Sequence, residues 1–113
     1  MLPINIPVLA LTERHVAVGD TITVAGVDAP VKITGVIFPE NLTMDVASLE
    51  KQARVAIPRT GDFSVVVSGF TPALLAVINA AASDATRVIY CLHWDSQQAT
   101  YISQAVYTAC LHG

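Results

Sequence analysis

Two short Cys-x-His patterns contain the residue types of this sequence that are best suited to metal chemistry. Cys91 and His93 form the first pattern, and Cys110 and His112 form the second. Residues two positions apart point to the same side of a β-strand, and cysteine and histidine are both ligands of zinc. A zinc site would therefore require the two patterns to meet at one ion.

The strands that we expect around these patterns keep them apart. The alternating residues over 86–94 and 99–110 predict two adjacent strands, and a turn at 95–98 places Cys91 opposite about Gln104. Cys110 then lies on the order of 20 Å further along the hairpin, at ~3.3 Å per residue, whereas a disulfide needs Cα atoms within about 7 Å. We therefore predict no metal site and two free thiols, as expected in a reducing compartment.

Two pairs of side chains are candidates for general acid–base chemistry. His93 lies near Asp95, and His15 lies near Asp20, and each pair combines a base with an orienting carboxylate. However, no serine occurs in the Gly-x-Ser-x-Gly setting of a nucleophile elbow, and no glycine-rich phosphate-binding pattern is present. The sequence therefore predicts no catalytic residue and no cofactor. A small enzyme that uses His93 or His15 is kept as the third of three interpretations of function, after the two that are given below.

The chain carries few charges for its size. Its 113 residues include 6 Lys and Arg and 9 Asp and Glu, and charged residues make up 13% of the sequence against 53% hydrophobic residues. An average soluble domain has roughly a quarter charged residues, and a small single domain has a large surface for its volume. We therefore expect a partner to cover part of the surface.

The net charge of -3 argues against binding nucleic acid through its phosphates. The sequence also contains no run of about 18 apolar residues, so we expect no membrane span.

The elements that must position these residues are mostly strands, because β-branched residues are abundant. Residues 1–11 are apolar, are interrupted by prolines and lack the basic start of a signal peptide, so we interpret them as an extended N-terminal arm that lies on a neighbouring subunit. The alternative is an edge strand or a frayed end. Thr71 as N-cap and Pro72 at the first helical position predict one clear helix over about 72–82. The segment 41–51 is interpreted as a polar loop or a short helix. The expected strands lie within 14–26 and at 31–38, 54–58, 63–68, 86–94 and 99–110.

This order of elements predicts a β-rich α+β fold for the single domain 1–113. We expect a small β-barrel or sandwich of about six to seven mainly antiparallel strands, with one flanking α-helix at about 72–82. A ligand-binding module built on such a β-barrel is the second interpretation of function.

From residue 60 to the end, the order of features resembles that of phage tail tube proteins. A turn at 60–62 leads into the strand at 63–68, a proline-bearing link follows, and a single helix then precedes the closing hairpin at 86–110. The resemblance implies a self-assembling structural protein of a long-tailed bacteriophage, related in fold to the type VI secretion tube protein. Its hexameric rings would stack into a tube for DNA passage. The short chain also fits another tail ring component, such as a terminator or baseplate subunit.

The resemblance also implies partners and a location. The chain would form homo-oligomers, contact other tail proteins and avoid membranes, and DNA would pass through the lumen only as cargo. It would be made in the host cytoplasm and reside in the tail of the virion. The residues expected at subunit contacts come from the apolar arm, the segment after residue 40, the weak basic cluster and the aromatic residues of the hairpin. These interface candidates are Ile4, Ile6, Val8, Leu42, Arg54, Arg59, Tyr101 and Tyr107.

Overall fold

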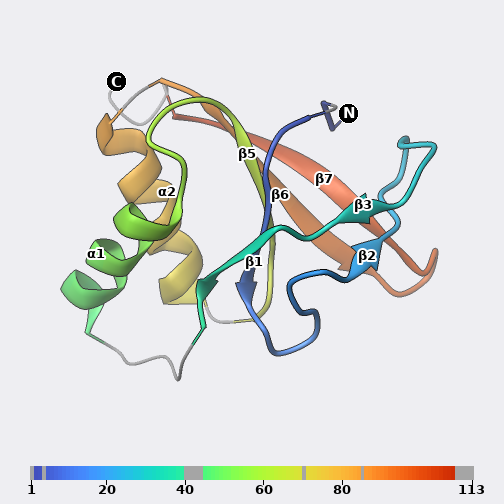
Figure 1. Ribbon diagram of the computed structural model, residues 1–113, viewed down its shortest axis with the longest axis horizontal. Coiled ribbons are helices and arrows are strands. Elements are labelled where there is room, and N and C mark those ends of the chain that lie inside the picture. Colours follow the sequence, from blue (N-terminus) through green and yellow to red (C-terminus); the bar gives the residue numbers. More distant parts are fainter. Residues whose placement is uncertain (1, 4, 40–44, 70, 85, 109–113) are drawn as a thin grey trace.

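The computed structural model describes residues 2–3, 5–39, 45–69, 71–84 and 86–108. Within these ranges the chain forms strands and helices that are arranged in layers (Figure 1). The strands are β1 (Val8–Thr12), β2 (Thr21–Ile22), β3 (Val31–Lys32), β4 (Gly35–Phe38), β5 (Phe63–Val66), β6 (Val88–Asp95) and β7 (Thr100–Tyr107). The helices are α1 (Val46–Ala56) and α2 (Thr71–Asp84).

Five strands form one open sheet in the order β4-β1-β5-β6-β7, and β2 and β3 form a separate antiparallel pair. The strands β4, β1, β5 and β6 are parallel to their neighbours in this order, and β7 runs antiparallel to β6. The expected α+β class with about seven strands is confirmed. The expected mainly antiparallel pairing is wrong, because a helical crossover such as α2 brings the chain back to the same end of the sheet and makes the joined strands parallel.

The main sheet separates two apolar cores. Both helices pack together on one face of the sheet, and the β2–β3 pair lies over the other face (Figure 1). Coverage of both faces is the usual setting of parallel strands. The helix-side core includes Leu9, Leu11, Leu49, Ala53, Phe63, Val65, Val77 and Ile89, and the opposite core includes Leu2, Val8, Ala10, Ile22, Val24, Ile33, Val66, Leu92 and Tyr101.

Strand β1 corrects the expectation of an N-terminal arm over residues 1–11. Val8–Thr12 is an interior strand between β4 and β5, and its residues from Val8 to Leu11 are all buried. A parallel strand that is buried on both faces has a continuous apolar run instead of an alternating pattern. The run of apolar residues that suggested an arm for a neighbouring subunit is therefore a core strand of this chain.

Helix α1 confirms the short helix that was one of two interpretations of the segment 41–51, and it shows that the strand expected at 54–58 is wrong. Asp45 is its N-cap, and the carboxylate accepts a hydrogen bond from Ser48 N at 3.3 Å. Leu49 and Ala53 are the buried residues of the helix, and their spacing of four places them on one helical face. The helix continues to Ala56, into the segment where we expected a strand. The fold thus has a second helix beside the one predicted.

Helix α2 and the last hairpin confirm the sequence predictions. α2 contains the whole of the predicted helix over 72–82, and Cys91 pairs with Gln104 in the β6–β7 ladder. Cys91 is a buried free thiol, and the second Cys-x-His pattern lies outside the described residues. In the part of the chain that the structure describes, no helix is long and apolar enough to cross a membrane.

Candidate functional site

The structure separates the predicted interface candidates by their exposure. Val8 is 4% exposed and Tyr101 is 8% exposed, so both belong to the core of this chain. Ile6 is half-buried and packs against the same core. The exposed candidates are Arg54, Arg59 and Tyr107, and the candidates outside the described residues are Ile4 and Leu42.

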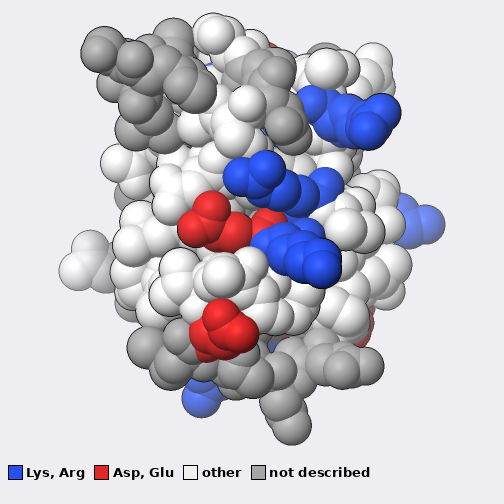
Figure 2. All heavy atoms as spheres, turned by 90° about the vertical axis from the view of Figure 1, so that its left-hand side faces the viewer, with Lys and Arg blue, Asp and Glu red and all other residues white. Residues whose placement is uncertain are grey.

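Arg54, one of the two basic candidates, belongs to α1 and therefore lies on the helix-covered side of the molecule. Arg54 lines a shallow hollow on α1 together with Glu50 and Lys51. Figure 2 shows that acidic and basic side chains lie next to one another on this side, and that most of the face carries no charge. The face is therefore neither an acidic nor a basic surface.

Three members of the predicted acid–base pairs, namely His93, Asp95 and Asp20, form hydrogen bonds with other groups. His93 Nε2 lies 2.9 Å from Gln104 Oε1, and Asp95 Oδ1 accepts a hydrogen bond from Gln97 N at 3.0 Å. The Asp20 carboxylate accepts a hydrogen bond from Ala17 N at 2.9 Å, which closes a turn. Among the described residues, no group of three or more His, Cys, Asp or Glu side chains is placed to hold a metal ion.

Strand β7 forms one edge of the main sheet, and only its first part is covered. Tyr101 N donates to Thr23 O, and Ala25 N donates to Tyr101 O, each at 2.9 Å. Main-chain groups alternate in direction along a strand, so those of Ser103, Ala105 and Tyr107 also point away from β6. No described residue forms a hydrogen bond to them.

The residue types of this open edge are unusual for an edge strand. Thr100–Tyr107 contains no charged residue, no proline and no glycine. Natural sheets protect their edges with charges, prolines, bulges or short strands, because a bare edge pairs with other chains. The hydroxyl of Ser103 is also buried without a hydrogen-bond partner among the described residues. We define the open edge as the outward main-chain groups of Ser103, Ala105 and Tyr107.

A cleft lies where three parallel strands end. We call it the strand-end cleft; its volume is about 460 Å³, and it opens beyond the carboxyl ends of β1, β5 and β6. The Thr12 and Ser68 hydroxyls, one from each of the segments that end β1 and β5, are hydrogen-bonded at 2.7 Å. Trp94 and Tyr101 meet edge to face, with ring centroids 5.2 Å apart. The residues that line the cleft are His15, Val16, Val66, Val67, Ser68, Gly69, Trp94 and Tyr101.

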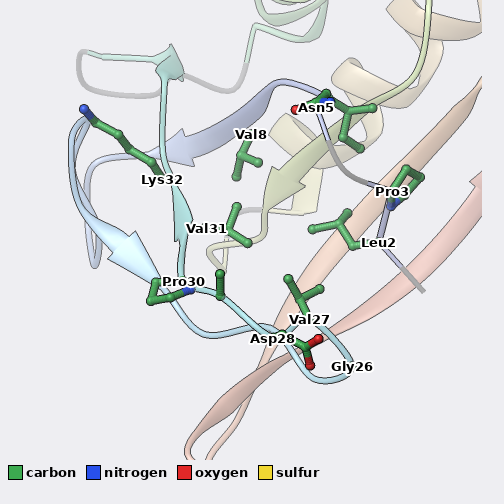
Figure 3. Close-up of a pocket in the computed structure, with 12 residues that line it drawn as sticks. Leu2, Pro3, Asn5, Val8, Gly26, Val27, Asp28, Pro30, Val31 and Lys32 are labelled. Atoms are coloured by element: carbon green, nitrogen blue, oxygen red, sulfur yellow. The ribbon is translucent and has the colours of Figure 1, made fainter.

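A second cavity of about 500 Å³ lies near the start of β1, on the face that β2 and β3 cover. We call it the amino-end cavity. Figure 3 shows Leu2, Val27 and Val31 around the hollow, whereas Lys32 extends away from it. Its walls are mainly aliphatic side chains and prolines, and its lining also includes the polar residues Asn5 and Asp28.

The sequence did not predict the strand-end cleft. His15 was considered as a base, and Tyr101 and Trp94 were assigned to an antiparallel hairpin, but their meeting with Ser68 depends on parallel strands whose order is set by the whole fold. The available signal was Ser68-Gly69 between a strand and a helix, because loops at such positions carry ligand sites in parallel sheets. Comparisons with protein-family models, curated proteins and solved structures find no match to this chain.

Proposed function

We propose that this chain is a structural subunit that assembles with copies of itself, as a ring component of a phage tail. The observation that carries this proposal is the uncharged open edge on β7. An edge of this kind pairs with a strand of another chain unless something covers it, and a regular assembly would use that tendency.

The composition supports the same function. Charged residues make up 13% of the sequence, and several large apolar side chains remain on the surface. An assembly would remove such apolar surface from water. The exposed large apolar residues are Val18, Val46, Val55, Leu75, Trp94, Ile102 and Tyr107.

The resemblance to phage tail tube proteins supports the kind of assembly. It rests on the order of a strand, one helix and a closing hairpin, and the chain has this order in β5, α2, β6 and β7. We propose hexameric rings that stack into a tube for DNA passage, in contact with other tail proteins of the virion. The alternative is that the chain forms another ring of the tail, as a terminator or baseplate subunit.

The two edges of the sheet suggest how a ring would close. β4, at the opposite edge from β7, reads Gly35-Val36-Ile37-Phe38 and also lacks charged residues. Pairing of β7 from one subunit with β4 of the next is a head-to-tail contact, and head-to-tail contacts form closed rings when the rotation between subunits permits it.

The test is to remove a donor from the open edge while the hairpin stays intact. Ala105→Pro deletes an N–H that points away from β6, so it removes a bond to a neighbour and no bond of the β6–β7 ladder. We expect the natural chain to form rings by light scattering and electron microscopy, and Ala105→Pro to be a folded monomer by circular dichroism and light scattering.

Charge provides a second, matched test. Tyr107→Lys places a charge beside the open edge, and Gln52→Lys places the same charge on α1, where Gln52 is an exposed polar residue. We expect Tyr107→Lys to disrupt rings and Gln52→Lys to leave them intact. A natural chain that stays monomeric at high concentration would refute the proposal, and so would assembly that both edge variants leave unchanged.

A further inference from the structure

We propose that the strand-end cleft is a binding site for a small planar aromatic molecule that carries a carboxylate. This site is separate from the open edge, because the cleft lies beyond the capped start of β7 whereas the open edge begins at Ser103. It therefore adds a binding function to the proposed structural one and does not depend on it.

The position of the cleft is the first argument. The chain leaves β1 through the β2–β3 pair and returns on one side as β4, whereas it leaves β5 through α2 and returns on the other side as β6. The connections from two neighbouring parallel strands thus diverge. In open sheets of this kind, ligands bind outside the carboxyl ends of the strands at the point of divergence.

The walls of the cleft indicate an aromatic ligand. Trp94 is 56% exposed although it packs edge to face on the buried Tyr101, so a large part of the indole is available at the cleft. The remaining walls are valines, namely Val16, Val66 and Val67. A flat ring would cover the exposed indole and contact these aliphatic walls, and a volume of about 460 Å³ is ample for such a molecule.

The polar groups of the cleft indicate a hydrogen-bond acceptor on that ring. Ser68 is 8% exposed, and its hydroxyl shares one hydrogen bond with the hydroxyl of Thr12. Thr12 Oγ1 also accepts a long hydrogen bond from Arg14 N, at 3.4 Å. Two hydroxyls carry two hydrogens and the bond between them uses one, so when Thr12 donates to Ser68 the hydrogen of Ser68 remains to donate into the cleft.

The charge of the lining favours an anion as that acceptor. The residues that line the cleft include His15, whose ring nitrogens can donate, and include neither Asp nor Glu. A carboxylate accepts only, and its hydrogen bonds to hydroxyl and imidazole donors are stronger than those of a neutral group. A single carboxylate between Ser68 and His15 therefore fits the donors of the cleft.

The single tryptophan of the chain makes the binding test direct. Trp94 is the only tryptophan, so its fluorescence reports on the cleft alone. We expect benzoate to cause a saturable change in this fluorescence, and backbone amide shifts in NMR spectra at Val67–Gly69 and at Trp94. Benzamide, which lacks the charge, and cyclohexanecarboxylate, which lacks the flat ring, should each bind more weakly.

Variants of Ser68 separate the role of the hydroxyl from its contribution to folding. Ser68→Ala is expected to weaken benzoate binding by about tenfold, because it removes a hydrogen bond to a charged group. Ser68→Thr keeps a hydroxyl and should restore much of the affinity. Ser83→Ala is the matched control, since the Ser83 hydroxyl bonds to Ala80 O on α2, away from the residues of the cleft.

Each result of this experiment has a definite meaning. The proposal is wrong if the fluorescence of the natural chain shows no saturable change with benzoate. It is also wrong if folded Ser68→Ala binds benzoate with the same affinity, or if the NMR shifts occur at the amino-end cavity. If benzamide binds more tightly than benzoate, the proposal that the ligand carries a carboxylate is wrong. The edge variant Ala105→Pro should bind benzoate like the natural chain, so failure of assembly and failure of binding can be told apart.

Discussion

The two ends of the main sheet use polar side chains in different ways. At the amino end, Arg87 is 4% exposed, and main-chain oxygens hold its guanidinium, with Nη1 2.6 Å from Pro58 O and Nε 3.3 Å from Ala81 O. At the carboxyl end, the hydroxyls of Thr12 and Ser68 bond to each other beside an open cleft.

The difference lies in what the polar groups join. Arg87 connects the segment after α1 with the last turn of α2, and its guanidinium carbon lies 5.5 Å from the centre of the Phe63 ring. Asp62 accepts from Val88 N at 2.9 Å at the same end. The amino end therefore holds the layers together, whereas the carboxyl end leaves a donor beside an aromatic wall. A fold of this size can concentrate stability at one end and recognition at the other.

Replacement of Arg87 should produce the largest effect and should be confined to stability. We expect Arg87→Met to lower the free energy of unfolding by about 3 kcal/mol, because it leaves buried carbonyl oxygens without their donor. Urea unfolding measures this loss, and benzoate affinity of the folded protein should not change.

A lysine variant makes the Arg87 prediction more specific. Arg87→Lys keeps the charge but lacks the planar fork that reaches Pro58 O and Ala81 O together, so its stability should fall between those of the natural chain and Arg87→Met. Equal stability of all three proteins would show that Arg87 does not stabilise the amino end of the sheet. A loss of benzoate binding in folded Arg87→Lys would show that the amino end also affects binding at the carboxyl end.

The carboxyl end should show the opposite balance, with a small loss of stability. Thr12→Val and Ser68→Ala should each cost about 1 kcal/mol, because each leaves one hydroxyl without its partner. The double variant should cost less than the sum, and urea unfolding of the four proteins gives the coupling. A strictly additive result would mean that the 2.7 Å contact does not stabilise the fold.

The sequence predicted the parts of this molecule whose patterns are local. The turn expected at 95–98 predicted the pairing of Cys91 with Gln104, and Thr71-Pro72 predicted the start of α2. Both depend on neighbours in the sequence, as hairpin registers and helix starts do.

The parts that were not predicted depend on contacts between distant segments. The residues Val8–Leu11 form an apolar run that suits an edge, an arm or a buried parallel strand, and only the order of strands decides among them. The residues of α1 near Arg54 also suit a strand, and the burial of Leu49 and Ala53 against the sheet overrides that preference. The strand-end cleft joins three strand ends, so its composition became visible only once those strands were placed side by side.

Raising the pH should have the smallest effect, and it tests the middle of β6, between the two ends. Burial raises the pKa of the Cys91 thiol above its ordinary value of 9.0, and burial likewise raises the pKa of Tyr101 above 10.0. In the unfolded chain these groups lose their protons at lower pH than in the folded one. Their contribution to stability is therefore complete below about pH 9 and declines as the pH rises through the folded values.

The variant Cys91→Ala separates the thiol from the tyrosines. The thiol has a lower ordinary pKa than the Tyr101 hydroxyl, and the variant removes it. The decline of the melting temperature with pH should therefore begin nearer 10.0, the ordinary pKa of tyrosine. The melting temperature at neutral pH will fall in this variant because a small cavity forms, so the comparison rests on the slope with pH alone. An unchanged onset would mean that a group other than Cys91 causes the decline, and that the pKa of this thiol does not differ between the folded and the unfolded chain.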